Sequence, residues 1–282
     1  MNINAVNFHL TKYCNYKCKF CFAEFNDKPL DKGLSKLEMF EIIELCAKNN
    51  IKKISFAGGE PMLCTWLNEL IIYAKKLKLT TMLVTNGHFL TEEWLKSVDG
   101  SLDWVSLSID SIDRNSLLKI GRARGRKTLS ENEFFMKFEY LKKQKIKLKI
   151  NTVVNQINYK EDLREFILKA KPKRWKIFKV LPVSGQSDKT INEMTIDDVQ
   201  FEFFINKNKT ILRQNINMVV ENNDLMTNSY LMIDPFGRFF DNSTKKLSYS
   251  KPILKVGFQN AISQISYSYE KFIERGGVWD WE

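Results

Sequence analysis

Histidine and cysteine are scarce in this sequence, apart from one short stretch. There are two histidines, His9 and His88, and five cysteines, none of which follows Cys64. Zinc prefers four protein ligands in paired C-x2-C units, and the chain has no second pair. An odd number of cysteines, three of them clustered, also argues against a disulfide framework and indicates a reducing compartment. We therefore expect a cytoplasmic protein, and we assign the two histidines no role.

Long apolar segments are absent as well. No hydrophobic run approaches the roughly 20 residues needed to cross a bilayer, and nothing near Met1 resembles a signal peptide. A hydrophobic content of 44% over 282 residues nevertheless supports a substantial core. No linker, low-complexity tract or repeat of fixed period marks an independent second domain. We expect one structural unit without membrane association.

The balance of charge is strongly positive, at +11. Nucleic acid, a membrane surface or a polyphosphate ligand would each match this charge. The net charge alone does not distinguish these three partners. The positions of the cations along the chain are more informative.

Short β-like runs alternate with helical patterns through the first 182 residues. The predicted strands are 4–10, 51–57, 81–85, 105–109, 145–153 and 174–181, and helical spacing lies between them, as in 37–47 (with Ser35 as its cap), 63–77 and 131–142. Strand followed by helix, six times over, implies parallel strands joined by crossovers. A doubly wound sheet and a partial (β/α)6 barrel both fit this α/β pattern. In both, ligands bind at the carboxyl ends of the strands.

The alternation weakens after residue 182. We expect a helix at 196–205, short strands at 215–220 and 229–233, and a turn at Pro235-Phe236-Gly237. Residues 1–182 are therefore predicted to form the barrel core. Residues 183–282 are predicted to be an extension that covers its open side and completes the substrate site.

The three clustered cysteines, Cys14, Cys18 and Cys21, form a C-x3-C-x2-C arrangement with Phe20 directly before the last one. A cubane iron–sulfur cluster needs four ligands, so three thiolates would leave one iron open to a small molecule. A zinc site or scattered buried thiols are the alternatives. The spacing and the aromatic residue resemble the signature of radical S-adenosylmethionine (SAM) enzymes, in which SAM binds the open iron of a [4Fe–4S] cluster. This resemblance favours the partial barrel, and the other two cysteines are expected to be buried thiols.

Segments after later strands would supply further contacts to SAM. Gly58-Gly59-Glu60-Pro61 ends the second predicted strand, and its glycines allow backbone to approach a ligand closely. In radical SAM enzymes such a segment contacts the methionine amino group. Ser108 is placed to bond a ribose hydroxyl, and Arg122 to clamp a carboxylate. The predicted metal ligands are thus Cys14, Cys18 and Cys21, and the predicted cofactor-binding residues are Tyr16, Phe20, Gly58, Gly59, Glu60, Asn86, Ser108 and Arg122.

Several predicted strands carry polar residues on one face only. Because side chains two apart share a face, the polar faces consist of Ser106, Ser108 and Asp110, of Lys145, Lys147, Lys149 and Asn151, and of Arg174 and Lys176. A parallel strand that is buried on both sides should be apolar on both. We place the apolar faces under the helices and the polar faces toward the barrel interior, although a solvent-facing edge is the alternative. A cationic interior beside a cluster indicates an anionic substrate.

A narrower resemblance covers nearly the whole chain, from about Asn7 onward. The blocks that carry it are Cys14-Asn15-Tyr16-Lys17-Cys18, Ile120-Gly121-Arg122, Lys149-Ile150-Asn151, Arg174-Trp175-Lys176, Ser229-Tyr230-Leu231 and Arg275-Gly276-Gly277. In order and spacing they resemble the viperin family. Viperins convert a ribonucleoside triphosphate (CTP, UTP or GTP) to its 3′-deoxy-3′,4′-didehydro form, a chain terminator in antiviral and antiphage defence. The vertebrate members carry an N-terminal amphipathic membrane helix that this sequence lacks.

The viperin resemblance implies roles for residues outside the cluster. Ser108 and Arg122 would hold SAM, and Tyr230 would be the catalytic proton donor. The triphosphate and ribose would be surrounded by Asn7, Lys53, Lys149, Asn151, Arg174, Lys176 and Arg275. A flavodoxin or ferredoxin would supply electrons. We expect a monomer that binds neither nucleic acid directly nor membrane.

Two rival functions belong to other classes. A radical SAM enzyme of peptide or cofactor maturation often adds C-terminal cysteine clusters, which this chain lacks. A non-catalytic iron–sulfur protein that binds nucleic acid would leave Arg122 and the interior cations unexplained. The radical SAM lyase acting on a nucleoside triphosphate is therefore the hypothesis we carry forward.

Overall fold

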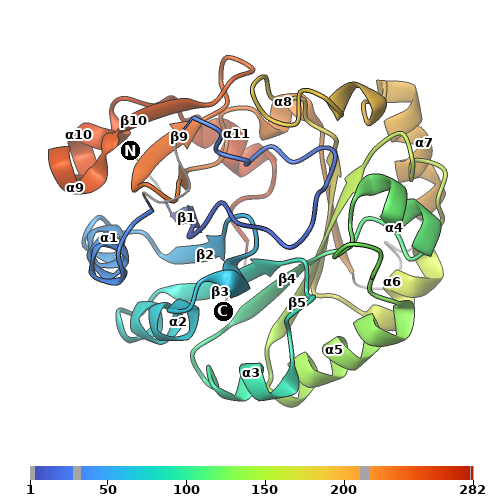
Figure 1. Cartoon of the computed structure of the whole chain (residues 1–282), viewed down its shortest axis with the longest axis horizontal. Coiled ribbons are helices and arrows are strands. Elements are labelled where there is room, and N and C mark those ends of the chain that lie inside the picture. Colours follow the sequence, from blue (N-terminus) through green and yellow to red (C-terminus); the bar gives the residue numbers. More distant parts are fainter. Residues whose placement is uncertain (1–3, 28–32, 210–215, 280, 282) are drawn as a thin grey trace.

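A single curved sheet forms the centre of the molecule, and it stays open between its two edge strands (Figure 1). The computed structural model describes residues 4–27, 33–209, 216–279 and 281. Within them the strand order is β10-β9-β8-β1-β2-β3-β4-β5-β6-β7. The six strands of the predicted core are β1 (Ala5–His9), β2 (Lys53–Ala57), β3 (Thr80–Thr85), β4 (Trp104–Ser108), β5 (Lys147–Val154) and β6 (Arg174–Lys179). They pair in parallel, which confirms the partial barrel.

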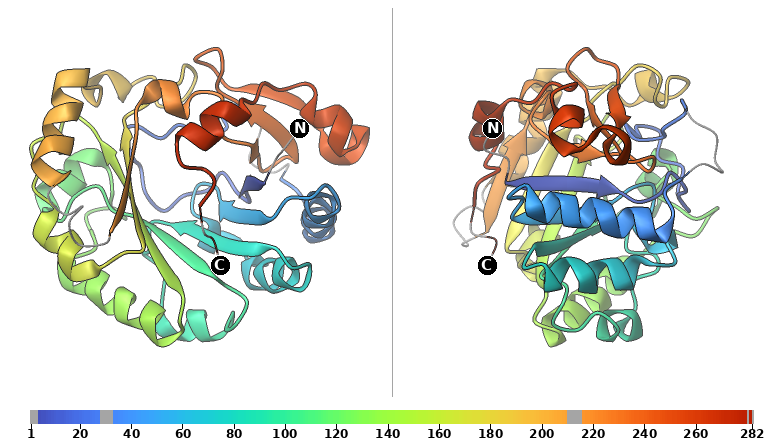
Figure 2. Two further views of the ribbon diagram at one scale, coloured as in Figure 1. Left: turned by 180° about the vertical axis from the view of Figure 1, so that it is seen from behind. Right: turned by 90° about the vertical axis from the view of Figure 1, so that its left-hand side faces the viewer.

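Helices line the outside of this sheet (Figure 2). They are α1 (Lys36–Lys48), α2 (Leu67–Lys76), α3 (Glu92–Lys96), α4 (Arg114–Ile120), α5 (Glu131–Lys143), α6 (Arg164–Ala170) and α7 (Asp198–Asn208), with short 3₁₀ turns η1 (Pro61–Leu63) and η2 (Ile191–Glu193). The predicted cap of α1 is confirmed, because the Ser35 hydroxyl accepts from the Glu38 amide while the Glu38 side chain accepts from the Ser35 amide. Such a reciprocal pair satisfies two amides that the helix itself leaves free.

Two predicted boundaries are wrong, for local reasons. The stretch 63–77 is not one helix, because η1 ends at Leu63 and α2 begins only at Leu67. The fifth strand does not start at Lys145, which has a φ of 54° and donates its amide to the Lys142 carbonyl. Lys145 therefore ends the turn that follows α5, and its side chain belongs to no strand face.

The apolar faces of the strands lie under the helices, as the alternation of side chains predicts. Val105 and Leu107 of β4 are fully buried. On β6, the Trp175 ring packs against Phe204 of α7 with ring centroids 6.3 Å apart. This arrangement turns the opposite, polar faces of β4, β5 and β6 into the barrel.

The C-terminal part extends both edges of the same sheet. β7 (Asn217–Glu221) pairs in parallel with β6, and β8 (Met232–Ile233) pairs in parallel with β1, on the far edge. β9 (Arg238–Asp241) and β10 (Ser248–Pro252) continue antiparallel from β8. The helices of this part are α8 (Asn223–Met226), α9 (Ile253–Val256), α10 (Phe258–Ile262) and α11 (Tyr269–Glu274). None of the helices in the described part of the chain is long and apolar enough to cross a membrane.

Three predictions for this part are correct only in outline. The helix predicted at 196–205 is α7, displaced toward the C-terminus. Of the strand predicted at 215–220, residue 215 lies outside the described residues and the remainder is β7. The strand predicted at 229–233 is only two residues long, because Ser229 instead donates its hydroxyl to the Leu225 carbonyl and accepts from Arg275.

The cysteine segment after β1 is pressed against the turn that ends β2. The Gly59 amide donates to the Thr11 carbonyl at 2.6 Å, and the Glu60 amide donates to the Tyr13 carbonyl at 2.8 Å. A Cβ on Gly59 would lie 2.2 Å from the Tyr13 carbonyl oxygen. Only glycine fits there, because the obstructing atoms belong to backbone.

Substituting this glycine tests the close approach. Gly59→Ala should lower the free energy of unfolding in urea by about 2 kcal/mol more than Gly100→Ala does. The control residue has nothing within 4 Å of its would-be Cβ, and its φ of 67°, which Gly59 does not share, costs about 1 kcal/mol on substitution. The loss at Gly59 should therefore exceed that of a substitution with a backbone penalty and no close contact. Equal losses in the two variants would show that the contact with Tyr13 is not tight.

Candidate active site

The barrel encloses a cavity of about 790 Å³, toward the upper end of the usual range for ligand sites. Its wall is made by inward-facing residues of the six core strands, the cysteine segment and the C-terminal residues. Among the residues predicted for the site, those that line it are Asn7, Cys14, Tyr16, Cys18, Phe20, Cys21, Lys53, Gly58, Gly59, Asn86, Ser108, Arg122, Lys149, Asn151, Arg174, Lys176, Tyr230 and Arg275. All but one of the residues that the sequence predicted for the site therefore line the same cavity.

The exception is Glu60, which the structure does not bring to the cavity wall. Its carboxylate is fully buried and accepts from the Thr85 hydroxyl at 2.6 Å, the Asn86 amide at 2.9 Å and the Met62 amide at 3.2 Å. It therefore ties the end of β2 to the end of β3. Asn86 then reaches Asn15 of the cysteine segment, donating its side-chain amide at 2.8 Å.

The three clustered thiols surround one end of the cavity. All five cysteines are free, and Cys46 and Cys64 are not in the wall. Burial raises the pKa of Cys18 to about 12 and that of Cys21 to about 11, although Arg122 opposes the shift in both. Metal binding would replace those protons. The thiols thus form a site whose chemistry suits a positively charged inorganic centre.

A mononuclear zinc site is not preformed among the residues that the structure describes. In the described ranges, no three side chains of His, Cys, Asp or Glu converge as they would around one metal ion. A polynuclear cluster holds its cysteines further apart, on different metal atoms. The donor set of three thiols without a fourth ligand therefore fits an iron–sulfur cluster with one open position.

Arg122 crosses the wall beside the thiols and is held by Asp110. Its Nε donates to the Asp110 carboxylate at 2.5 Å, and its guanidinium lies 5.5 Å from the centre of the Phe20 ring. The other Asp110 oxygen accepts from the Val153 amide at 2.8 Å. Burial would favour neutral Arg122, but Asp110 and the thiols raise its pKa overall. This guanidinium is therefore oriented before any ligand arrives.

Cations fill the rest of the cavity wall. Lys53, Arg174, Lys176 and Arg275 are each less than 9% exposed, and Lys149 lies beside them. Burial, followed by repulsion from Arg174 and Arg275, lowers the pKa of Lys149 to about 7, although Glu221 opposes this. The pKa values of Lys53 and Lys176 also fall well below the usual value for lysine, mainly through burial. Such a group of partly desolvated cations requires an anionic ligand.

Glu221, the last residue of β7, is the carboxylate that pairs with these cations. It is fully buried, contacts the Lys176 ammonium, and lies 3.6 Å from the Arg275 guanidinium. Burial favours its protonated form, but Lys176 and Arg275 lower its pKa overall. Sequence reasoning missed Glu221, because a single acid at the end of a short strand has no distinctive signal.

Tyr230 lies inside this ionic network. Its hydroxyl donates to Glu221 at 2.5 Å and accepts from the Lys176 ammonium at 2.9 Å, and the Arg275 guanidinium stacks 3.5 Å from its ring centre. Burial and then Glu221 raise its pKa well above the usual value for tyrosine, despite the opposing effect of Arg275. Tyr230 is therefore a protonated phenol with a fixed orientation.

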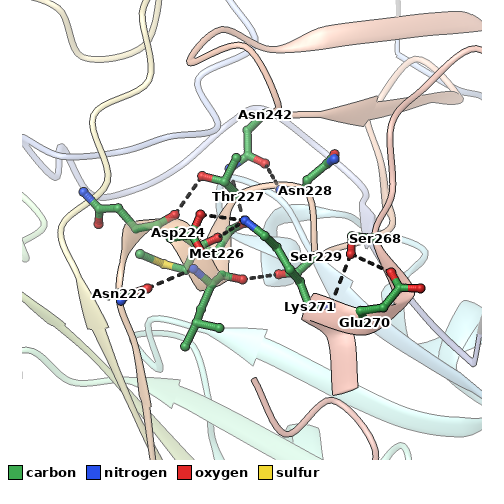
Figure 3. A network of polar contacts seen from close by, with 12 residues as sticks. Asn222, Asp224, Met226, Thr227, Asn228, Ser229, Asn242, Ser268, Glu270 and Lys271 are labelled. Atoms are coloured by element: carbon green, nitrogen blue, oxygen red, sulfur yellow. Dashed lines mark hydrogen bonds and ion pairs between the residues drawn. The ribbon is translucent and has the colours of Figure 1, made fainter. Parts of the chain in front are cut away.

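The connection that carries Tyr230 is anchored by the network in Figure 3. Lys271 of α11 donates to both the carbonyl and the carboxylate of Asp224, at 3.0 and 2.7 Å. The Asn228 amide donates to Asn242 at 2.9 Å, and Ser229 accepts from Arg275 at 2.8 Å. The position of the phenol thus depends on contacts of α8, of Asn242 directly after β9, and of α11.

Two C-terminal indoles, Trp279 and Trp281, also line the cavity and were not predicted for the site. The Trp279 ring centre lies 4.4 Å from the Arg174 guanidinium and 4.9 Å from the Lys53 ammonium. Trp281 stacks on the same lysine at 5.2 Å, and its carbonyl accepts from the Trp104 indole at 2.9 Å. These rings stabilise cations through their π faces.

His9, to which the sequence assigned no role, is part of the cavity wall as well. It is 4% exposed and packs edge-on against Phe25 and Phe240, with ring centroids 5.4 and 5.3 Å away. Burial lowers its pKa to about 3, so it is a neutral wall residue. His88 contacts Tyr16 edge-on at 5.9 Å.

Comparison with known proteins agrees with this geometry. Residues 8–170 match the radical SAM superfamily. The chain is 47% identical to an S-adenosylmethionine-dependent nucleotide dehydratase of Lacinutrix mariniflava over 99% of its own length, and spans 59% of that relative. It is 43% identical to the enzyme of the same name from Flammeovirga pacifica, covering 99% of this chain and 97% of the relative.

The fold is shared with more distant enzymes. SuiB of Streptococcus suis, solved with S-adenosylmethionine bound, superposes with a TM-score of 0.67 at 18% identity, over 84% of this chain and 59% of SuiB. At that identity the likeness concerns the fold alone. Radical SAM enzymes use a [4Fe–4S] cluster and SAM, and the thiols and Arg122 suit both. The chain belongs to the radical SAM superfamily and, within it, to the S-adenosylmethionine-dependent nucleotide dehydratases.

Proposed function

We propose that this protein removes water from the ribose of a ribonucleoside triphosphate, CTP, UTP or GTP, and releases the 3′-deoxy-3′,4′-didehydro analogue. The observation that carries the proposal is the division of one cavity into two ends. One end has three thiols and Arg122, and the other has five cations, two of which, Lys176 and Arg275, lie beside the buried carboxylate of Glu221. A triphosphate carries about four negative charges, which the charge-assisted hydrogen bonds of such cations would neutralise. A role of the product as a chain terminator in antiviral or antiphage defence stays a prediction.

Each side of the cavity has a separate task in this proposal. Cys14, Cys18 and Cys21 hold the cluster, and Arg122 receives the carboxylate of SAM. When bound, the cluster and SAM supply a 5′-deoxyadenosyl radical that abstracts a hydrogen atom. The cations grip the triphosphate and so fix the ribose relative to SAM, because positioning is the main contribution a protein makes to such a reactive centre.

Tyr230 supplies the proton in the proposed reaction. The C4′ hydrogen leaves as an atom, and the 3′ hydroxyl takes up a proton and leaves as water. One electron from the external electron donor, a flavodoxin or ferredoxin, then completes the double bond. The fixed orientation of the phenol supports this role, because its hydroxyl donates to Glu221 at 2.5 Å and accepts from Lys176 at 2.9 Å. Lys176 can in turn restore the proton.

Cysteine substitution tests the cluster ligands. Cys14→Ala, Cys18→Ala and Cys21→Ala should each lose nearly all bound iron after anaerobic reconstitution, together with SAM cleavage, since no other cysteine lines the cavity. Iron content and 5′-deoxyadenosine formation are the measurements. Cys46→Ala, which changes a fully buried thiol of α1, serves as the control and should keep both. Retention of full iron by the Cys18 variant would contradict the assignment.

Binding of the triphosphate should take up protons from neutral to mildly alkaline pH. With a pKa of about 7 in the free protein, Lys149 is mostly neutral at pH 8, and a phosphate beside it raises that pKa and favours the charged form. Affinity should therefore fall as the pH rises above 7. Calorimetry in buffers of different ionisation enthalpy measures the uptake.

Lys149→Arg is the matched variant for this experiment, because it keeps the charge but cannot titrate. Its proton uptake should be smaller than that of the parent by a measurable fraction of a proton, while binding persists. The interpretation fails if triphosphate binding is independent of pH and releases or takes up no protons.

The reaction itself is tested with a nucleotide deuterated at C4′. Deuterium should appear in 5′-deoxyadenosine by mass spectrometry, and Tyr230→Phe should still cleave SAM while forming at least tenfold less didehydro product. The phenylalanine keeps the packing against Arg275 and removes only the proton. Product formation with all deuterium left in the nucleotide rules out abstraction at C4′. Running the four ribonucleoside triphosphates in parallel identifies the base.

A further inference from the structure

The outer side of the cysteine segment is bordered by exposed cations. They are Lys17, Lys119, Arg124, Arg126 and Lys127, and we refer to them as the basic rim. Lys119, Arg124, Arg126 and Lys127 do not line the cavity. These four residues therefore add positive charge outside the cavity, where a ligand bound inside it does not contact them.

Backbone contacts join the rim directly to the segment that carries the thiols. The Lys17 amide donates to the Gly121 carbonyl at 3.2 Å, and the Lys19 amide donates to the Ile120 carbonyl at 2.9 Å. The Cys18 sulfur lies 3.9 Å from that Gly121 oxygen. A Cβ on Gly121 would come within 2.0 Å of the Lys17 carbonyl oxygen, so a glycine is what permits this approach.

The rim cations form no ion pair in the residues that the structure describes, although the Arg124 guanidinium lies 5.7 Å from the centre of the Phe89 ring. None of the five has a carboxylate within ion-pair distance, whereas the neighbouring Lys19 pairs with Glu193 at 3.0 Å. The nearby Asp113 is used as the cap of α4, accepting from the Ser116 amide at 2.8 Å. Folding therefore does not account for this accumulation of like charge.

The tip of the rim is also preorganised. Arg124 and Lys127 exchange two backbone hydrogen bonds, at 2.9 and 3.1 Å, and Arg126 accepts from the Arg114 guanidinium through its carbonyl. A tight turn of this kind presents its cations in a fixed arrangement. Ordering such a surface costs a partner little conformational entropy.

Two exposed aromatics flank the thiols at the cavity mouth. Tyr13, directly before Cys14, is 52% exposed, and Phe22, directly after Cys21, is 39% exposed. Apolar residues next to a charged border are a common composition for a protein interface. The surface over the thiols thus has both the charge and the aromatic contacts that a docking site needs.

We propose that the basic rim docks a small acidic one-electron carrier protein. The inference rests on the proposed function, because reductive cleavage of SAM consumes an electron that the substrate does not supply. No cysteine cluster other than Cys14, Cys18 and Cys21 exists in the sequence to relay it. On docking, the reduced carrier loses one electron and the cluster gains it. A negatively charged carrier is steered to this surface by the rim, which raises its association rate.

Charge reversal on the turn tests the docking directly. The variant Arg124→Glu/Arg126→Glu/Lys127→Glu should raise the Kd for an acidic flavodoxin or an acidic [2Fe–2S] ferredoxin at least tenfold at 50 mM salt. The matched control is Lys52→Glu/Lys76→Glu/Lys142→Glu, which reverses three exposed lysines, one directly before β2 and two in the last turns of α2 and α5. It should stay within twofold of the parent. Higher salt should remove the difference between variant and parent.

Turnover with two reductants, dithionite and the carrier protein, distinguishes a failure of this inference from a failure of the proposed function. Turnover with dithionite should be unchanged in the rim variant, along with its iron content and its KM for nucleotide, whereas carrier-driven turnover should fall at least tenfold. Absence of product in every protein under dithionite would count against the proposed function, while the binding result still decides the docking.

The docking is overturned by either of two results. The first is that the rim variant binds both carriers as tightly as the parent does. The second is that the variant loses affinity for a single-stranded RNA probe but keeps its affinity for the carriers, which would assign the rim to nucleic acid.

Discussion

Burial of cations inside the barrel is the constraint on which the rest of the site depends. Lys53, Arg174, Lys176 and Arg275 project from β2, β6 and the C-terminal segment into one space, where burial lowers the pKa values of the lysines. Desolvating charges is costly unless they are paired. The chain offsets part of that cost with Glu221 and with the indole faces of Trp279 and Trp281. The remaining positive charge favours a polyanionic ligand.

The opposite end of the same cavity has a different physical character. Thiols with raised pKa values lie beside Arg122, whose orientation is set by a buried carboxylate. The two ends accept ligands of different chemistry and hold them within one enclosed volume. Glycines at the ends of β2 and α4 permit this, because the backbone of the cysteine segment packs against them without room for a side chain.

Much of the fold and the site could be predicted from local pattern. Period-two alternation placed Ser108, Lys149 and Arg174 on inward faces, and each lines the cavity. A predicted strand boundary was wrong where the backbone conformation departs from the pattern of side chains. Lys145 was predicted to begin the fifth strand, but its positive φ places it at the end of the turn after α5. Glu60 differs from the other predicted site residues for a related reason. Three hydrogen bonds from the end of β3 and from η1 hold its carboxylate, and it does not line the cavity.

The sequence by itself determined the spacing of the three thiols and the polar faces of the strands, because both depend only on neighbouring residues. Tertiary structure decided which distant groups meet. Glu221 reaches Tyr230 only because β7 and β8 join opposite edges of one sheet. Trp279 reaches Arg174 only because the segment after α11 returns to the barrel. Such contacts are set by long-range chain closure and packing, and residues that make them carry no periodic signal along the chain.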